Sequence, residues 1–297
     1  MTTKLYIAKA LMLFMATLLS GLTACAPKVV APPPQPAKVA VVLGAGAARG
    51  FAHVGVLKVL ESRNIPIHMV VGTSVGSLVG CLYAYGYDGY KLQALAHAME
   101  RDDVVDLTLP ANGFIKGEKL ENYVNRMVHG AAIEAFRIPF HAVAADIQTG
   151  EETVFGTGNA GMAVRASCSV PGVFQPARIS GRTYVDGGLV SPIAVDVARR
   201  YGADVIIAVE ISAVRSMIVP QGTIDTILQS VDIMYAKISE IQLPRADVVI
   251  RPEVGHIASS DFTKRHEAIL AGEKAAAAAM PAIEAVLAKS RQAGRVP

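Results

Sequence analysis

The sequence predicts an α/β fold, a three-layer sandwich in which a central, mostly parallel β-sheet is flanked by helices. Apolar runs such as Val39–Leu43, Ile67–Val71 and Val205–Val209 have the near-continuous hydrophobicity of strands that are covered on both faces. Segments with helical spacing of apolar residues follow these runs, which is typical of parallel sheets with crossover helices. Of the 297 residues, 52% are hydrophobic and 18% are charged, so the chain can bury a large core.

The first segment has the pattern of a targeting sequence. Two lysines precede a short apolar run, Ala10–Leu22, which is shorter than the ~20 residues that span a bilayer. The run ends in Leu22-Thr23-Ala24-Cys25, which resembles a bacterial lipobox. This resemblance implies that residues 1–24 are a lipoprotein signal peptide and that acyl chains on Cys25 anchor the protein to a membrane. An ordinary signal peptide with an incidental cysteine is the alternative.

Five prolines lie between Ala26 and Ala37 and predict an extended spacer, so residues 25–37 are interpreted as a lipid-anchored linker. Alanine rather than aspartate follows Cys25, which resembles the pattern that sorts lipoproteins to the periplasmic face of the outer membrane. Residues 38–252 hold the predicted strands and motifs of a catalytic domain. Residues 253–297 are expected to form a helical extension that packs on it.

A loop of small residues, Gly44–Gly50, joins the first strand to a helix predicted over Phe51–Arg63. Such loops either bind a phosphate or offer backbone amides to an oxyanion. The Gly-Lys-Ser/Thr ending of a P-loop is missing, and Arg49 stands where a dinucleotide fingerprint needs glycine. The oxyanion interpretation is favoured because the next strand ends in a serine motif.

That serine motif is Gly72-Thr73-Ser74-Val75-Gly76, which has the G-x-S-x-G spacing of a nucleophile elbow. A serine on a tight strand-to-helix turn brings backbone so close that a Cβ at either flanking glycine would collide with it. The apolar helix that follows directs its N-terminal amides toward Ser74, where an oxyanion would form. A turn of small residues without chemistry is the other interpretation.

The rest of the chain continues the alternation of helices and strands. The expected elements are amphipathic helices over Tyr87–Met99 and Gly117–Val128, a strand Phe140–Asp146 with hairpin partner Thr153–Phe155, a helix from Asn159 or Gly161 to Ser169, a hairpin Arg178–Val185, a helix Pro192–Tyr201, the strand Val205–Val209, a helix Thr223–Gln242, an edge strand Val248–Arg251 and helical structure over Phe262–Lys289. Arg101–Lys116 is expected to be a connection. Asp186-Gly187-Gly188 follows the second hairpin and is either a simple turn or a carboxylate that backbone can approach closely.

Taken together and in order, Gly44–Gly50, Gly72-x-Ser74-x-Gly76 and Asp186-Gly187-Gly188 resemble the motifs of the patatin-like phospholipase family. Arg165-Ala166-Ser167 supports this resemblance, and Gly113–Gly117 with Asp247–Pro252 is similar to the bacterial RssA-type subgroup. The resemblance implies a serine–aspartate dyad that uses no histidine, metal or cofactor. Its substrates are lipid or other fatty acyl esters, as in phospholipases, lysophospholipases and esterases.

By this resemblance Ser74 is the nucleophile and Asp186 the general base, and the amides of Gly46, Ala47 and Ala48 form the oxyanion hole. The remaining motif positions are Gly44, Arg49, Gly50, Gly72, Gly76, Gly187 and Gly188. Ala45 and Ala47 stand where the family often has glycine, and alanine disfavours a positive φ. We interpret Arg49 as one half of an internal ion pair.

Two other functions remain as alternatives. The first is an α/β-hydrolase with a Ser-Asp-His triad, which would need His256 or His266 because only these histidines follow Asp186. The second is a non-catalytic envelope lipoprotein that binds lipid or acts as a scaffold. The net charge of +3 is too small and too scattered for nucleic acid. No C-x-x-C pair is present, which argues against a cysteine-based zinc or redox site. Cys81 and Cys168 are expected to be buried free thiols, with a disulfide between them in an oxidising compartment as the alternative.

Overall fold

The computed structural model describes residues 37–109, 112–212 and 219–292, with five separate positions near the N-terminus: Thr3, Tyr6, Ile7, Lys9 and Met12. The chain divides into two compact units, Met1–Gln35 and Pro36–Pro297, and the fold lies in the second. The predicted lipobox and Cys25 lie outside the described residues, so lipidation stays a prediction. Within the described ranges, no helix is both long enough and apolar enough to span a bilayer.

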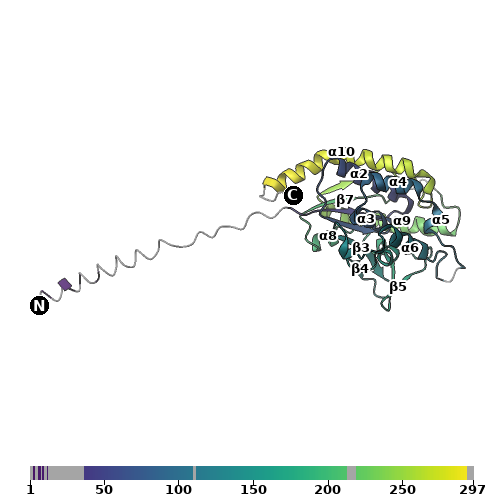
Figure 1. Ribbon diagram of the computed structural model, residues 1–297, viewed down its shortest axis with the longest axis horizontal. Coiled ribbons are helices and arrows are strands. Elements are labelled where there is room, and N and C mark those ends of the chain that lie inside the picture. Colours follow the sequence, from purple (N-terminus) through teal and green to yellow (C-terminus); the bar gives the residue numbers. More distant parts are fainter. Residues whose placement is uncertain are drawn as a thin grey trace. The chain divides into compact units, whose positions relative to one another are not determined.

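One mixed sheet of eight strands runs through the second unit (Figure 1). The strands are β1 (Val39–Leu43), β2 (Met69–Thr73), β3 (Phe140–Asp146), β4 (Glu152–Phe155), β5 (Ala177–Ile179), β6 (Arg182–Asp186), β7 (Val205–Val209) and β8 (Val248–Ile250). Their order is β5-β6-β3-β2-β1-β7-β8, and β4 pairs with β3 beside this path. Strands β3, β2, β1, β7 and β8 are parallel to one another, which confirms the predicted mostly parallel sheet.

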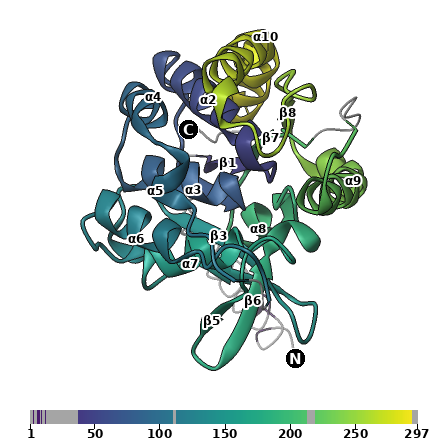
Figure 2. The same ribbon diagram turned by 90° about the vertical axis from the view of Figure 1, so that its right-hand side faces the viewer.

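Antiparallel hairpins form the other end of the sheet. Strand β4 pairs back on β3, and β5 pairs with β6, as the sequence predicts. The β5–β6 turn has Ser180 at φ 50° and Gly181 at φ 81°, the two positive values of a tight hairpin turn. Figure 2 shows this hairpin projecting from the edge of the sheet. Strand β8 lies at the opposite edge, again as predicted.

The helices are α2 (Phe51–Ser62), α3 (Val75–Tyr85), α4 (Gly89–Ala98), α5 (Arg101–Val104), α6 (Glu118–Met127), α7 (Ala160–Ser167), α8 (Val195–Arg200), α9 (Thr223–Gln242) and α10 (Arg265–Gln292), with 3₁₀ turns η1 (Ala47–Gly50), η2 (Ile133–Ala135), η3 (Gly187–Leu189), η4 (Leu243–Arg245) and η5 (Phe262–Lys264). Most of the predicted helices are present. The helix expected from Pro192 begins only at Val195, because the Pro192 carbonyl accepts a hydrogen bond from the Ala45 amide. Helix α5 was missed within the predicted connection.

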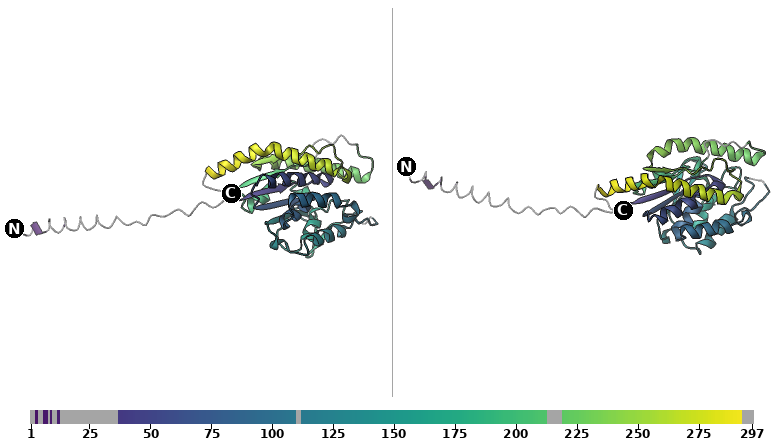
Figure 3. Two further views of the ribbon diagram at one scale, coloured as in Figure 1. Left: turned by 45° about the horizontal axis from the view of Figure 1, so that its top comes forward. Right: turned by 90° about the horizontal axis from the view of Figure 1, so that it is seen from above.

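The core explains why helices cover both faces. Alternate residues of a strand point to opposite faces, so Val41 packs in the cluster with α2, α3 and α10, whereas Val42 packs in the cluster with α8. Helix α10 lies along the outside of its layer (Figure 3). It approaches α2 closely: a Cβ on Gly272 would lie 2.0 Å from the Ala52 carbonyl oxygen.

Candidate active site

Ser74 occupies the turn between β2 and α3. Its backbone has φ 54° and ψ −128°, a left-handed φ that is uncommon for a residue with a side chain. Both flanking glycines are required for steric reasons. A Cβ on Gly72 would lie 2.4 Å from the Gly76 carbonyl oxygen, and one on Gly76 would lie 2.1 Å from the Leu43 carbonyl oxygen. The turn therefore has the strained, closely packed geometry of a nucleophile elbow.

Two other serines hold this strained turn. The Ser74 amide donates to Ser167 Oγ at 2.9 Å, and Ser167 Oγ donates to the Val143 carbonyl at 2.5 Å. Ser77 Oγ donates to the Ser74 carbonyl at 2.6 Å. In the sequence, Ser167 is only part of the Arg165-Ala166-Ser167 motif. That it holds the turn at Ser74 follows from the contact between α7 and this turn.

Asp186 ends β6, on the other side of β3 from Ser74. Thr73 pairs with Val143 and Asp186 pairs with Ala144, so the register places the ends of β2 and β6 at the same level on either side of β3. Asp186 is fully buried, and its Oδ1 accepts a hydrogen bond from the Gly188 amide at 2.8 Å. Its Oδ2 has no well-aligned hydrogen bond among the described residues, although hydroxyl donors lie beside it.

The environment of Asp186 makes it a suitable proton acceptor. Burial raises the pKa of its carboxyl from 3.8 to about 6, and the neighbouring Ser74 hydroxyl, Gly188 amide and Tyr235 hydroxyl act in the opposite direction. A carboxylate with a pKa just below neutrality is ionised at pH 7 and still basic enough to take a proton from a hydroxyl. Hydrogen bonds between catalytic groups are often long or poorly aligned until substrate binds, which agrees with the geometry of Oδ2.

The loop after β1 leaves fewer backbone amides free to bind an oxyanion than the sequence predicts. The amides of Gly44 and Ala45 donate to the Val209 and Pro192 carbonyls. The Ala48 amide donates to the Ser259 carbonyl at 3.1 Å, so its role as an oxyanion donor stays a prediction that requires this hydrogen bond to break. The amides of Gly46 and Ala47 have no acceptor among the described residues and stay as candidate oxyanion donors.

Ala47 adopts φ 49°, the left-handed conformation that alanine disfavours. Backbone strain is thus present at both the loop and the elbow. Such strain clusters at functional sites, where the surrounding fold enforces it.

Arg49 forms the internal ion pair expected from the sequence. Its Nη2 lies 2.5 Å from Asp232 Oδ1 on α9, and both side chains are buried. Ser259 Oγ donates to the other Asp232 oxygen at 2.7 Å. Asp232 thereby links the loop after β1 to α9 and to the segment before η5. Removing one partner of a buried ion pair leaves an uncompensated charge, so the pair keeps these three segments together.

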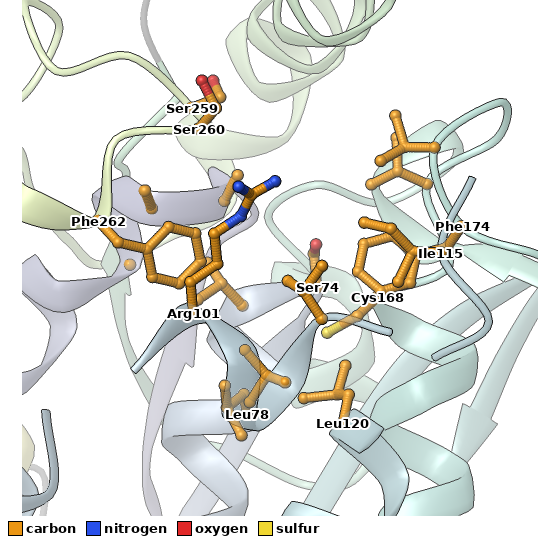
Figure 4. Close-up of a pocket in the computed structure, with 18 of the residues that line it drawn as sticks. Ser74, Leu78, Arg101, Ile115, Leu120, Cys168, Phe174, Ser259, Ser260 and Phe262 are labelled. Carbon is orange, nitrogen blue, oxygen red and sulfur yellow. The ribbon is translucent and has the colours of Figure 1, made fainter. Parts of the chain in front are cut away.

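A cavity of about 210 Å³ opens above Ser74. Its walls are mainly apolar side chains from η1, α3, α9, residues 99–107 and 114–115 and the segment after α7, with Leu120 on α6 and Phe262 on η5. Figure 4 shows Ser74 at its centre, with Arg101 and Phe262 on one side and Ile115 and Phe174 on the other. Cys168 lies beside Ser74 and is a free thiol, as is Cys81. An apolar cavity with a single strained serine suits a hydrocarbon chain attached to a reactive ester.

The histidines required by a Ser-Asp-His triad lie elsewhere. His256 is half exposed and pairs with Glu267, and the His266 ring lies 6.0 Å from that of His97. No histidine lines the cavity in the part of the chain that the structure describes. The geometry of the described residues therefore does not support the triad alternative. Three or more potential metal-ligating side chains do not gather anywhere among the described residues.

The fold and this site can be compared with known proteins. A family model described as "Patatin-like phospholipase" matches residues 41–199, just over half of the chain. The chain belongs to the patatin-like phospholipase family. The match contains the loop after β1, the Ser74 elbow and Asp186, which are the motifs on which the resemblance was based.

Individual patatin-like relatives agree with this assignment. An uncharacterised NTE family protein of Mycobacterium tuberculosis is 35% identical over 181 residues, which are 59% of this chain and 49% of the relative. The lysophospholipase NTE1 of Coccidioides immitis is 35% identical over 196 residues, which are 64% of this chain and 12% of the relative. The chain thus spans at most about half the length of these relatives.

Among solved structures, VipD from Legionella pneumophila has a similar fold, with a TM-score of 0.57 at 12% identity. The alignment covers 84% of this chain and 67% of VipD. It supports the architecture of the patatin-like domain, an α/β fold with a mixed sheet between helices.

Helix α9 lies beyond the matched region and still contributes to the site. Asp232 pairs with Arg49, and the Tyr235 ring packs so closely on Gly188 that a Cβ there would lie 2.2 Å from it. Sequence reasoning found α9 as a helix but missed both residues. The available signal was their spacing of three residues, which places the two side chains on one face of a helix.

Proposed function

We propose that the protein is a serine acyl hydrolase that cleaves fatty acyl esters of lipids through an acyl-enzyme on Ser74. The observation that supports this most is the position of Ser74: it is strained, it lines an apolar cavity, and a buried carboxylate of raised pKa lies on β6, on the other side of β3. Family membership supports the same class of reaction. The similarity to a lysophospholipase supports phospholipids or lysophospholipids as the substrates.

In the first step, Ser74 Oγ attacks the ester carbonyl carbon while Asp186 accepts the hydroxyl proton. The carbonyl oxygen becomes an oxyanion, which the amides of Gly46 and Ala47 and the N-terminus of α3 stabilise. The carbon–oxygen bond to the alcohol then breaks, and Asp186 gives its proton to the departing oxygen. The acyl group remains as an ester of Ser74.

In the second step, water attacks the Ser74 ester and gives a proton to Asp186. A second oxyanion forms in the same place, and its collapse breaks the bond to Ser74 Oγ. The proton returns from Asp186 to Oγ, which restores the serine and releases the fatty acid. The apolar cavity holds the acyl chain through both steps and excludes water from its length.

The apolar cavity predicts that the rate of hydrolysis depends on the length of the acyl chain. We expect the protein, with detergent present, to hydrolyse p-nitrophenyl octanoate and laurate faster than the acetate, and to release fatty acid from lysophospholipid. Replacing Leu78, which lines the cavity, with tryptophan should lower the laurate-to-acetate ratio of kcat/KM about tenfold, because a bulkier wall displaces part of the chain.

Leu270→Trp is the matched control, since Leu270 is half exposed on α10 and does not line the cavity. Its chain-length profile should equal that of the unmodified protein. A folded protein that neither hydrolyses any of these esters nor reacts with a fluorophosphonate probe would contradict the proposal and favour a non-catalytic lipid-binding lipoprotein.

We further propose that the protein is anchored in the bacterial envelope through lipidated Cys25. The proposal rests on Leu22-Thr23-Ala24-Cys25 and the proline-rich segment that follows it. Expressed in a Gram-negative host, the full chain should partition with membranes and incorporate labelled palmitate. The Cys25→Ser variant should lose the label and appear in the soluble fraction, and retention of the label by this variant would exclude Cys25 as the acylated residue.

A further inference from the structure

We propose that Tyr235 on α9 is a positioning residue for Asp186, donating a hydrogen bond from its hydroxyl to Asp186 Oδ2. The inference rests on the proposed function, because it takes Asp186 to be the general base. It adds to the dyad a residue from outside the region that defines the family match.

The packing around Asp186 leads to this residue. Tyr235 is buried, and its ring lies directly over Gly188, whose amide holds the other oxygen of the carboxylate, Oδ1. A side chain at position 188 would displace the ring, since its Cβ would lie 2.2 Å from the ring carbon that bears the hydroxyl. The Asp-Gly-Gly motif therefore has a steric partner on α9.

Two buried polar groups remain unsatisfied at this contact. Neither the Tyr235 hydroxyl nor Asp186 Oδ2 has a well-aligned hydrogen bond among the described residues. One is a donor and the other an acceptor, and each influences the ionisation of the other. Because a buried polar group without a partner is costly, a small adjustment that joins the two is favourable.

The other ionisable groups at this point do not replace Tyr235. Ser74 also faces Asp186, but its proton is the one that Asp186 must accept. Burial first and the Asp186 charge second raise the pKa of the Cys168 thiol, so it stays neutral. Asp232 faces Tyr235 along α9 and is held by Arg49. Tyr235 itself stays protonated, because burial and then the Asp186 charge raise its pKa.

A donor to Oδ2 has two consequences for the reaction. It fixes the carboxylate plane, so that the oxygen facing Ser74 is presented in one orientation. It also favours the ionised form, which lowers the pH at which Asp186 becomes a base. Loss of the hydroxyl would therefore reduce hydrolysis most strongly on the acid side of the pH profile.

The test compares Tyr235→Phe with the unmodified full chain. The rate of fluorophosphonate labelling and kcat/KM for p-nitrophenyl octanoate would be measured from pH 5 to pH 9. In the unmodified protein both should rise with an apparent pKa near 6, the value of Asp186. In Tyr235→Phe the rise should move up by about one pH unit, with most of the activity recovered at high pH.

Tyr123→Phe is the control, because Tyr123 is a buried tyrosine on α6 whose neighbours are Asp103 and Tyr87 rather than Asp186. It should leave the profile in place. A uniform loss across the pH range in Tyr235→Phe, or an unchanged profile, would overturn the inference. An unmodified protein with no activity at any pH would instead contradict the proposed function.

Discussion

Ser74→Ala should abolish acyl ester hydrolysis and fluorophosphonate labelling while leaving the fold intact. The loss should be on the order of 10⁴-fold or more, because without Oγ no acyl-enzyme can form. Alanine at φ 54° has the same unfavourable backbone conformation as serine, so little change in the free energy of unfolding is expected. Steady-state hydrolysis of p-nitrophenyl octanoate and urea unfolding, measured on the same sample, separate the two effects.

Ser62→Ala provides the control for this substitution. Ser62 ends α2 and its hydroxyl donates only to the Val59 carbonyl, away from the cavity. Its activity should equal that of the unmodified chain. Substantial hydrolysis by a folded Ser74→Ala protein would show that another nucleophile carries the reaction, and the proposed mechanism would have to be abandoned.

Asp186→Asn should lower kcat on the order of 10²–10⁴-fold, the usual contribution of a general base. Asparagine has nearly the same shape and can keep the hydrogen bond from the Gly188 amide through its carbonyl oxygen. It cannot accept the proton of Ser74. The variant should therefore bind substrate with a similar KM, which initial-rate kinetics at pH 8 would check.

The same substitution should stabilise the protein at high pH. The folded-state pKa of Asp186 is raised from 3.8 to about 6, so the folded state binds the proton more tightly than the unfolded state. Stability attributable to this proton is present below pH 4 and is lost as pH rises through 6. The shift corresponds to up to roughly 3 kcal/mol in the free energy of unfolding, which Asp186→Asn should recover at pH 8.

Urea unfolding at pH 4 and pH 8 tests whether the free energy of unfolding changes with pH in this direction. The difference between Asp186→Asn and the unmodified protein should be small at pH 4 and favour the variant at pH 8. Asp196→Asn, at an exposed ion pair with Arg245, should change stability by no more than about 1 kcal/mol at either pH. A variant that is less stable at pH 8 and still active would contradict both the burial argument and the role of Asp186.

The sequence alone was enough to predict the sheet and the position of the elbow. Continuous apolar runs in β1, β2 and β7 can be buried on both faces only in a parallel sheet covered by helices. The glycine at 72 is likewise a local requirement, because a Cβ there would collide with the Gly76 carbonyl four residues further on. Such patterns depend on neighbours in the chain, so they can be read without a structure.

Contacts between segments far apart in the sequence determine the oxyanion donors and the partners of the buried site residues. The Ser259 carbonyl accepts the hydrogen bond of the Ala48 amide. The amides of Gly46 and Ala47 are the candidate oxyanion donors that have no acceptor among the described residues. Asp232 is the partner of Arg49, and Tyr235 packs on Gly188 of the Asp-Gly-Gly motif, both from a helix outside the family motifs. Hydrogen bonding and charge pairing act through space over a few ångströms. The identity of a buried partner therefore depends on how the chain packs, which only the tertiary structure decides.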